Sequence, residues 1–150
     1  MFRALIETAQ TWFTAPLRIA LGLVFIAHGA QKVFGVWGGP GIAKFAAGEA
    51  PMGLSPGWLW LGAAAIAELL GGVLVLLGLL TRLGALMLVP VMLVAIFGVH
   101  WTGGFFLSNK GYEYALSLLG MALALLISGG GRASIDEALM GRRGGSGRRR

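Results

Sequence analysis

The feature of this chain that most constrains its fold is an apolar stretch that runs from Trp58 to Trp101. Built as one α-helix at 1.5 Å per residue, it would be about 65 Å long, roughly twice the thickness of the hydrocarbon core of a bilayer. The pair Thr81-Arg82 is the break near its middle. The stretch therefore predicts two helices that each cross a membrane, at about 57–79 and 83–101.

Composition supports a membrane protein and argues against a soluble one. Of the 150 residues, 57% are hydrophobic and only 12% are charged, whereas a soluble domain carries about 25% charged residues. Two further apolar segments, at about 17–35 and 112–128, bring the expected number of spans to four. Because the chain has no cysteine, disulfides, thiolate metal sites and dithiol redox chemistry are excluded. We therefore expect an all-α, polytopic membrane protein with a four-transmembrane-helix bundle over 16–131.

The segments outside this bundle have other patterns. Apolar residues recur at helical spacing in 1–15, which favours an amphipathic helix lying on the membrane surface; a frayed terminus is the alternative. Residues 36–57 form the longest connection. The tail, 132–150, is rich in arginine and glycine without apolar periodicity, so we expect it to be disordered. Its arginines are typical of a patch that binds anionic lipid. Nucleic-acid binding is not expected beside four membrane spans.

Charge gives the expected orientation. With four spans, the two termini and the turn near residue 82 share one side of the membrane, which carries nine arginines against three lysines on the other side. The positive-inside rule then places both termini in the cytoplasm. Six aromatic residues fall at the opposite ends of the spans, as in an aromatic belt: Trp37, Trp58, Trp60, Trp101, Tyr112 and Tyr114. The basic residues are Arg3, Arg18, Arg82, Arg132, Arg142, Arg143, Arg148, Arg149 and Arg150 on one side and Lys32, Lys44 and Lys110 on the other.

Ionisable residues inside the predicted spans are the candidates for function, because a charge within a bilayer is costly. Glu68 lies near the middle of the second span, among alanine and leucine residues. His28 lies in the first span, with Gln31 and Lys32 three and four residues later on the same helix face. Antiparallel threading brings six polar residues to the outer half of one bundle as a candidate site for a ligand head group: His28, Gln31, Lys32, Glu68, His100 and Glu113.

This cluster also has a structural interpretation. A Glu–Lys or Glu–His pair can simply fasten two helices together, since hydrogen bonds between membrane helices contribute about 0.6 kcal/mol on average. Residues near helix ends can also reach water. We favour function for Glu68 and His28, as a candidate proton relay, and fastening for Lys32, His100 and Glu113. Nothing in the spacing selects a metal site or assigns a catalytic residue.

Small residues predict close packing of two of the helices. Ala63, Ala67 and Gly71 recur every four residues in the second span, and Gly120 and Ala124 repeat this spacing in the fourth. Such residues allow the backbones of neighbouring membrane helices to approach closely. We expect these faces to lie inside a compact bundle that is too narrow for a wide aqueous pore.

Several short motifs also occur in a fixed order along the chain. They are RIALGLVFIAHGAQKVFG at 18–35, AELLGG at 67–72, LGLLTR at 77–82, GYEYA at 111–115 and GRASID at 131–136. Taken together, they resemble the DoxX family of small bacterial inner-membrane proteins over roughly 15–137. Any one of these motifs alone would be weak, whereas the ordered set is specific.

The resemblance implies a fold and a biochemical setting rather than one reaction. Members of the family are four-helix membrane proteins, and the family is named after a terminal quinol oxidase. Relatives include the membrane subunit of thiosulfate:quinone oxidoreductase, and others are linked to oxidative-stress complexes or to detoxification of quinones and catechols. The resemblance therefore implies a membrane subunit of a quinone-linked redox or oxidative-stress system, with quinone as the expected ligand and no intrinsic cofactor evident.

Other functions stay open at this level. The chain could be a non-catalytic accessory subunit that packs against a larger membrane complex through its glycine and alanine faces. In either reading we expect partner membrane or redox proteins, and the sequence does not decide whether the protein is an enzyme. A transporter of small solutes is less favoured, because no inverted repeat or broken helix pair is visible.

Overall fold

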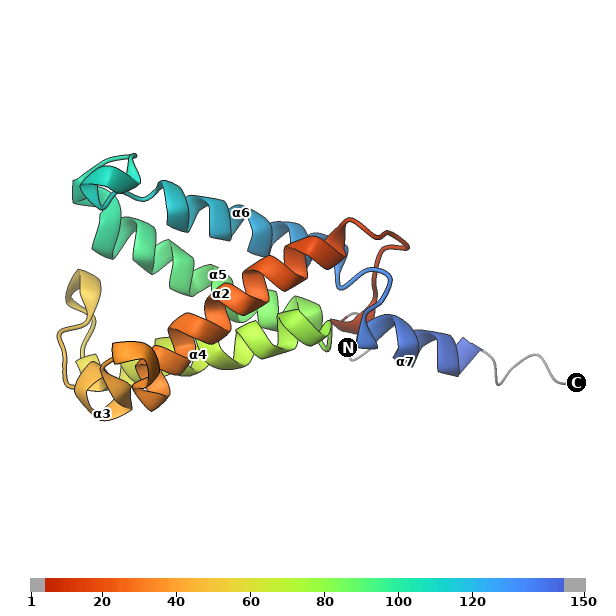
Figure 1. The fold of residues 1–150 in the computed structure, drawn as a ribbon, viewed down its shortest axis with the longest axis horizontal. Helices are drawn as coiled ribbons and strands as arrows, with labels where there is room; N and C mark the ends of the chain where they lie inside the picture. Colours follow the sequence, from red (N-terminus) through yellow and green to blue (C-terminus); the bar gives the residue numbers. More distant parts are fainter. Residues whose placement is uncertain (1–4, 145–150) are drawn as a thin grey trace, which may run out of the picture.

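The computed structural model describes residues 5–144, and this part of the chain is helical with no β-strand (Figure 1). Its four long apolar helices are α2 (Thr14–Phe34), α4 (Gly57–Leu77), α5 (Thr81–Val94), which continues into the π-helix η3 (Ala95–His100), and α6 (Glu113–Ser128). The shorter elements are η1 (Val36–Gly38), α3 (Gly41–Ala46), η2 (Pro51–Gly53), η4 (Trp101–Gly103), η5 (Leu107–Asn109) and α7 (Ile135–Gly144).

Three of the helices are long and apolar enough to cross a membrane. They are Thr14–Phe34, Gly57–Leu77 and Thr81–Gly103, with mean hydropathies of 1.3, 2.1 and 2.3. These bounds agree with the spans expected from the sequence to within a few residues. The fourth apolar helix, α6, is present at the expected place but has only 16 residues. The all-helical fold is therefore confirmed, whereas a fourth crossing of the membrane stays a prediction.

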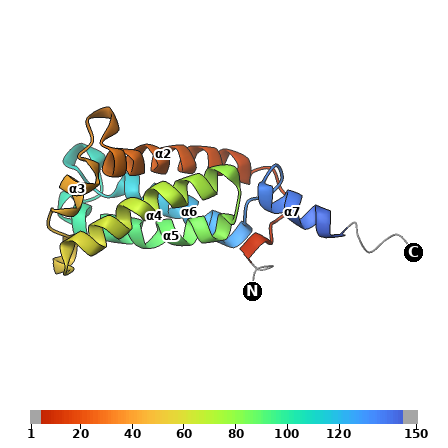
Figure 2. The same cartoon turned by 90° about the horizontal axis from the view of Figure 1, so that it is seen from below.

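The bundle has two different ends (Figures 1 and 2). Helix α2 packs along α4, α4 packs on α5, and α5 packs on α6. At one end, which we call the termini end, the N-terminal segment, the α4–α5 turn and α7 come together. At the other, the loop end, the connection 35–56 with α3 and the connection 101–112 cover the bundle. In Figure 1 the pair α2–α4 diverges from the pair α5–α6 toward the loop end.

Glycines allow α2 and α4 to pack in direct backbone contact. A Cβ atom added to Gly29 would lie 2.5 Å from the backbone nitrogen of Leu69, and one added to Gly22 would lie 2.7 Å from the Cβ of Leu76. Neither position has room for a side chain, so the absence of one permits the close approach. This contact places the part of α2 near the loop end alongside the middle of α4.

The small-residue faces are only partly as expected. A Cβ on Gly71 would lie 2.9 Å from the Leu88 side chain, so this glycine packs against α5 as predicted. Gly120, in contrast, is exposed, and nothing lies within 4 Å of its Cβ position. The prediction of an inward-facing Gly120 is therefore wrong, because α5 and α2 contact α6 through other faces.

Over 7–13, the N-terminal segment is not the amphipathic helix that its spacing favours. Residues 5–6 are helical, but residues 7–13 are not. The backbone N–H of Ala9 donates to the Ser128 carbonyl (2.8 Å), and Arg82 Nε donates to the Glu7 carbonyl (3.1 Å). The segment therefore satisfies its backbone at the termini end of α5 and α6, in place of the internal hydrogen bonds of a helix.

The prediction of a disordered tail is wrong for the residues that the structure describes. Residues 135–144 form α7, and Asp136 within it is only 1% exposed. The N–H of Glu137 donates to the Ser134 hydroxyl (3.1 Å), and the N–H of Ala133 donates to the Glu137 carboxylate (3.1 Å). This arrangement is close to a capping box, which starts a helix without apolar periodicity. The rest of the predicted tail, 145–150, lies outside the described residues.

Candidate functional site

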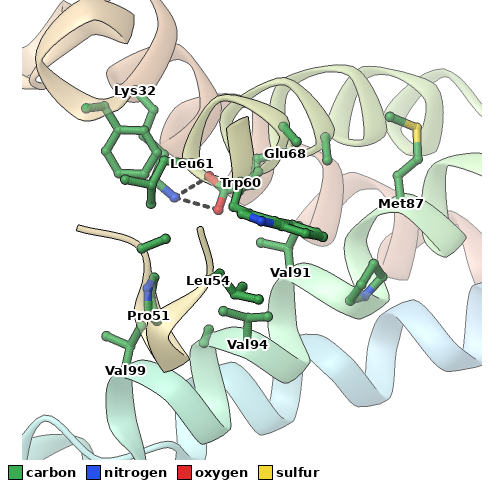
Figure 3. A pocket seen from close by; sticks show the side chains of 17 residues that line it. Lys32, Pro51, Leu54, Trp60, Leu61, Glu68, Met87, Val91, Val94 and Val99 are labelled. Carbon is green, nitrogen blue, oxygen red and sulfur yellow. Dashed lines mark hydrogen bonds and ion pairs between the residues drawn. The ribbon is translucent and has the colours of Figure 1, made fainter. Parts of the chain in front are cut away.

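A cavity of about 310 Å³ lies at the loop end, between α4 and α5 and beneath the connection 45–54 (Figure 3). Its volume is at the lower end of the range for small-molecule sites, about 300–1,000 Å³. Its walls are apolar except for one lysine and one glutamate. The lining side chains from α4 and α5 include Trp60, Leu61, Ala63, Ala67, Met87, Pro90, Val91 and Val94.

The polar part of the cavity wall is an ion pair between Lys32 of α2 and Glu68 of α4. The Lys32 Nζ atom lies 2.5 Å from each oxygen of the Glu68 carboxylate. The side chain of Glu68 is 5% exposed and that of Lys32 is 24% exposed. The Lys32 ammonium also lies 5.3 Å from the centre of the Phe45 ring, within the range of a cation–π contact. Burial of both partners together keeps each charge compensated.

Local backbone features bring these side chains together. Helix α2 ends at Phe34, and the next residue, Gly35, adopts a left-handed conformation (φ 72°) and donates its N–H to the Gln31 carbonyl. The chain then turns back through η1 into α3, which packs against both α2 and α4 and carries Phe45. The close approach of Gly29 to Leu69 sets Lys32 one helical turn further along, beside Glu68.

The connection above the cavity rests on η3. A Cβ atom placed on Gly98 would lie 2.9 Å from both the Cβ of Pro51 and the Cγ of Met52. The loop that contains η2 therefore packs against the one residue of η3 that has no side chain. Ala50, Pro51 and Leu54 of this loop, together with Phe45 of α3, form the roof of the cavity.

The structure brings together two of the six residues expected to form the site. Lys32 and Glu68 form the ion pair described above, whereas His28 is exposed on α2 and does not line the cavity. His28 and Lys32 are four residues apart, which separates them by about 40° around the helix. The Lys32 side chain bonds Glu68, whereas the His28 side chain, at its own angle on α2, is exposed. Gln31 does not line the cavity either.

The other two candidates order the second connection of the loop end. His100 Nδ1 lies 2.8 Å from the Lys110 carbonyl oxygen, and Glu113 accepts a hydrogen bond from the N–H of Leu107 (2.5 Å). Both contacts hold the turn over 101–112, away from the cavity lining. Between residues 5 and 144, no group of three or more His, Asp or Glu side chains is arranged to hold a metal ion.

Sequence reasoning missed the apolar residues that shape the cavity. The position of Trp60 near the end of its predicted span favours a place in the aromatic belt, yet Trp60 lines the cavity. Pro90 marks the same place on α5, since proline inside a helix often accompanies a cavity or kink in membrane proteins. The α3–η2 roof carried no sequence signal beyond its unusual content of apolar residues for a loop.

A second group of buried polar residues lies at the termini end. The carboxylate of Asp136 accepts hydrogen bonds from the N–H of Leu80 (2.7 Å), the N–H of Thr81 (2.9 Å) and the Thr81 hydroxyl (2.7 Å). Arg18 donates to the carbonyls of Leu76 (3.3 Å) and Ala133 (3.0 Å). This termini-end network joins α2, α5 and α7. Two features of the sequence indicate this network: the aspartate of the GRASID motif, Asp136, and the capping spacing Ser134-x-x-Glu137.

Comparison with known proteins supports the resemblance stated above. A family model described as DoxX matches residues 13–101, which include the Lys32–Glu68 pair and the roof of the cavity but not α6 and α7. A protein of Haemophilus influenzae described as an uncharacterized protein is 33% identical over 139 residues, which cover 88% of this chain and 94% of that protein. No solved structure matches the chain.

Proposed function

This chain belongs to the DoxX family of membrane proteins, and on that premise we propose that its loop-end cavity binds the head group of a lipophilic quinone. The protein would serve as a membrane subunit of a quinone-linked redox or oxidative-stress system. The observation that carries the proposal is the Lys32–Glu68 pair, which is the polar part of an otherwise apolar cavity wall. A pair that only fastened two helices would have no need to border a cavity.

The chemistry of the wall fits a quinone ring. A quinone presents two carbonyl oxygens on a flat apolar ring, and a quinol presents two hydroxyl groups. The Lys32 ammonium can donate a hydrogen bond to a carbonyl oxygen, and the Glu68 carboxylate can accept one from a hydroxyl. Trp60, Val91 and Val94 offer apolar contact to the ring. A bound quinone would supply the capacity to accept two electrons, and the residues of this chain would hold and orient it.

Binding of a benzoquinone that has no tail tests the proposal. We expect Lys32→Gln to weaken the affinity for this quinone, and Glu68→Gln to weaken the affinity for the corresponding quinol, each about ten-fold or more, since a charge-assisted hydrogen bond contributes about 1.5–3 kcal/mol. His28→Gln is the control, because His28 is exposed and outside the cavity. The measurement is quenching of tryptophan fluorescence in detergent. Unchanged affinity in both cavity variants would contradict the proposal.

We also propose that all four long helices cross a bacterial inner membrane, with the termini end in the cytoplasm. Arg82 and Arg132 lie at the termini end, and Lys44 and Lys110 lie at the loop end. Of the exposed tryptophans, Trp37, Trp58, Trp60 and Trp101 lie at the loop end and Trp12 lies at the termini end. The positive-inside rule and the aromatic belt support this orientation. Because the chain has no cysteine, Ser55→Cys and Ala138→Cys can be introduced singly. In intact cells, an impermeant maleimide should label only the Ser55→Cys variant. Labelling of the Ala138→Cys variant alone would show the opposite orientation.

For the tail we propose contact with anionic lipid through its arginines. Each basic residue near an anionic surface contributes about 1 kcal/mol, and this attraction falls with salt. Binding of the full-length protein to acidic lipids should therefore weaken with added salt more than binding of a chain that ends at residue 144. Equal salt dependence of the two chains would count against this role.

A non-catalytic accessory subunit is the second candidate, favoured by the outer face of α6. Gly120 is exposed there, with the exposed side chains of Leu116, Leu123 and Ile127 on the same helix. An outward-facing glycine lets a partner helix approach closely. If this reading is correct, Gly120→Leu removes co-purifying membrane proteins while the tailless quinone still binds equally to wild type and to the cavity variants.

A further inference from the structure

The cavity is long relative to its volume. Its lining residues on the α5–η3 helix extend from Met87 to Val99, a separation of about 18 Å at 1.5 Å per residue. The polar Lys32–Glu68 pair occupies one place along this length, and apolar side chains line the rest. A ligand that consisted of one ring would contact the Lys32–Glu68 pair but leave part of the apolar cavity wall uncovered.

The cavity is open along the outer surface of the α4–α5 seam. Ala63 and Pro90, on opposite helices, line the cavity and are both exposed. Trp60 is also a lining residue and is 46% exposed. In a membrane, the exposed faces of these two spans contact lipid. The opening therefore faces the acyl chains of the bilayer.

The opposite boundary of the cavity is closed by the loop-end roof. Phe45, Pro51 and Leu54 line the cavity from the side of α3 and η2, and Figure 3 shows the labelled Pro51 and Leu54 below the Lys32–Glu68 pair. The roof is seated on Gly98 of η3, so it packs against the bundle and does not stand away from it. A ligand that reaches the ion pair without displacing this roof has to come through the seam.

From this geometry we infer that the ligand is an amphiphile with an apolar chain, which enters from the bilayer through the α4–α5 opening. Its polar ring lies at Lys32 and Glu68, and its chain lies in the opening lined by Ala63, Met87 and Pro90. The inference rests on the proposed function for the ring, but it makes a separate claim about the chain. A water-soluble aromatic compound would use the ion pair and gain nothing from the opening.

The test compares two probes on the same variants: a tailless methoxy-benzoquinone and the same ring carrying a decyl chain. Ala63→Leu narrows the opening with a residue that is common in membrane helices. It should weaken binding of the decyl probe about ten-fold, because each methylene group excluded from an apolar site costs roughly a factor of four. Binding of the tailless probe should change less than about two-fold. Comparing each probe with itself cancels its partition into detergent.

Ala20→Leu is the matched control, since Ala20 is an exposed alanine of α2 outside the cavity, and it should change neither affinity. Met87→Phe is a second variant that fills the opening from α5, in case Ala63→Leu fails to fold. An equal loss for both probes, or no loss for the decyl probe in either variant, would overturn the inference.

The proposed function fails in a different way. If the tailless probe binds the double variant Lys32→Met/Glu68→Leu as well as it binds wild type, the head-group site is wrong. The selective loss of the decyl probe in Ala63→Leu would still stand as evidence for a chain in the opening.

Discussion

The two ends of the bundle bury polar side chains in opposite ways. At the termini end, five polar side chains are less than 10% exposed: Thr14, Arg18, Thr81, Ser134 and Asp136. All of them are hydrogen-bonded, Ser134 within its own turn and the other four to segments distant in the sequence. At the loop end, Lys32 and Glu68 bond only to each other and border a cavity.

This difference separates polar groups that hold the fold from polar groups that are available to a ligand. A buried polar atom whose partners are fixed backbone groups loses free energy of folding when it is removed. An ion pair at a cavity wall can exchange one partner for a ligand atom. The account therefore predicts that the termini end determines stability, whereas the loop end determines binding.

The largest expected effect is at Asp136. Asp136→Ala removes three hydrogen bonds from the N-terminus of α5 and should lower the free energy of unfolding by about 3 kcal/mol or more. Unfolding in a denaturing detergent gives this value. Glu137→Ala is the matched control on the same helix, with a single exposed hydrogen bond to backbone, and should cost about 1 kcal/mol or less. Equal losses in the two variants would remove the special role of the termini-end network.

A smaller loss of folding stability is expected at the α2–α4 contact, which lies between the two ends of the bundle. Gly29→Ala places a Cβ atom 2.5 Å from the Leu69 nitrogen, and such overpacking costs about 1–3 kcal/mol. It should also separate Lys32 from Glu68 and weaken quinone binding. Gly120→Ala, with open space around its Cβ position, should leave stability unchanged or raise it by up to about 1 kcal/mol. Unchanged stability and unchanged quinone binding in Gly29→Ala would show that α2 and α4 can move apart without cost.

The smallest stability effects are expected at the ion pair. Lys32→Met leaves a carboxylate that is only 5% exposed without its cation, and should cost about 1–2 kcal/mol because the carboxylate loses its hydrogen-bond donor. The double variant Lys32→Met/Glu68→Leu removes both charges and should lie within about 0.5 kcal/mol of wild type, as is common when apolar residues replace a buried pair. A loss in the double variant as large as in Asp136→Ala would make the pair a structural fastener.

The helices could be predicted from the sequence because their signals are local. Apolar length and the Thr81-Arg82 break locate the spans to within a few residues of α2, α4 and α5. The N-terminal segment and α7 could not be predicted in this way. Their conformation depends on partners distant in sequence, such as Ser128 for Ala9 and Leu80 for Asp136.

The candidate site could be predicted only in part, because some of its signals are local and others depend on distant contacts. Glu68 stood out as a charge among apolar residues, and antiparallel threading brought Lys32 to its level. His28 could not be ruled out of the pair by sequence, because its direction depends on the rotation of α2, which the contacts of Gly22 and Gly29 with α4 fix. The roof at Phe45, Pro51 and Leu54 depends on how a loop folds back, and periodicity does not report this.

Two variants test most directly whether the termini end determines stability and the loop end determines binding. Melting temperature and affinity for the tailless benzoquinone are measured for Asp136→Ala and for Lys32→Met/Glu68→Leu, with affinity determined well below both melting points. The account predicts that Asp136→Ala melts at a lower temperature but binds the quinone like wild type, whereas the double variant melts like wild type and loses binding about ten-fold or more. A double variant that binds the quinone like wild type would contradict it.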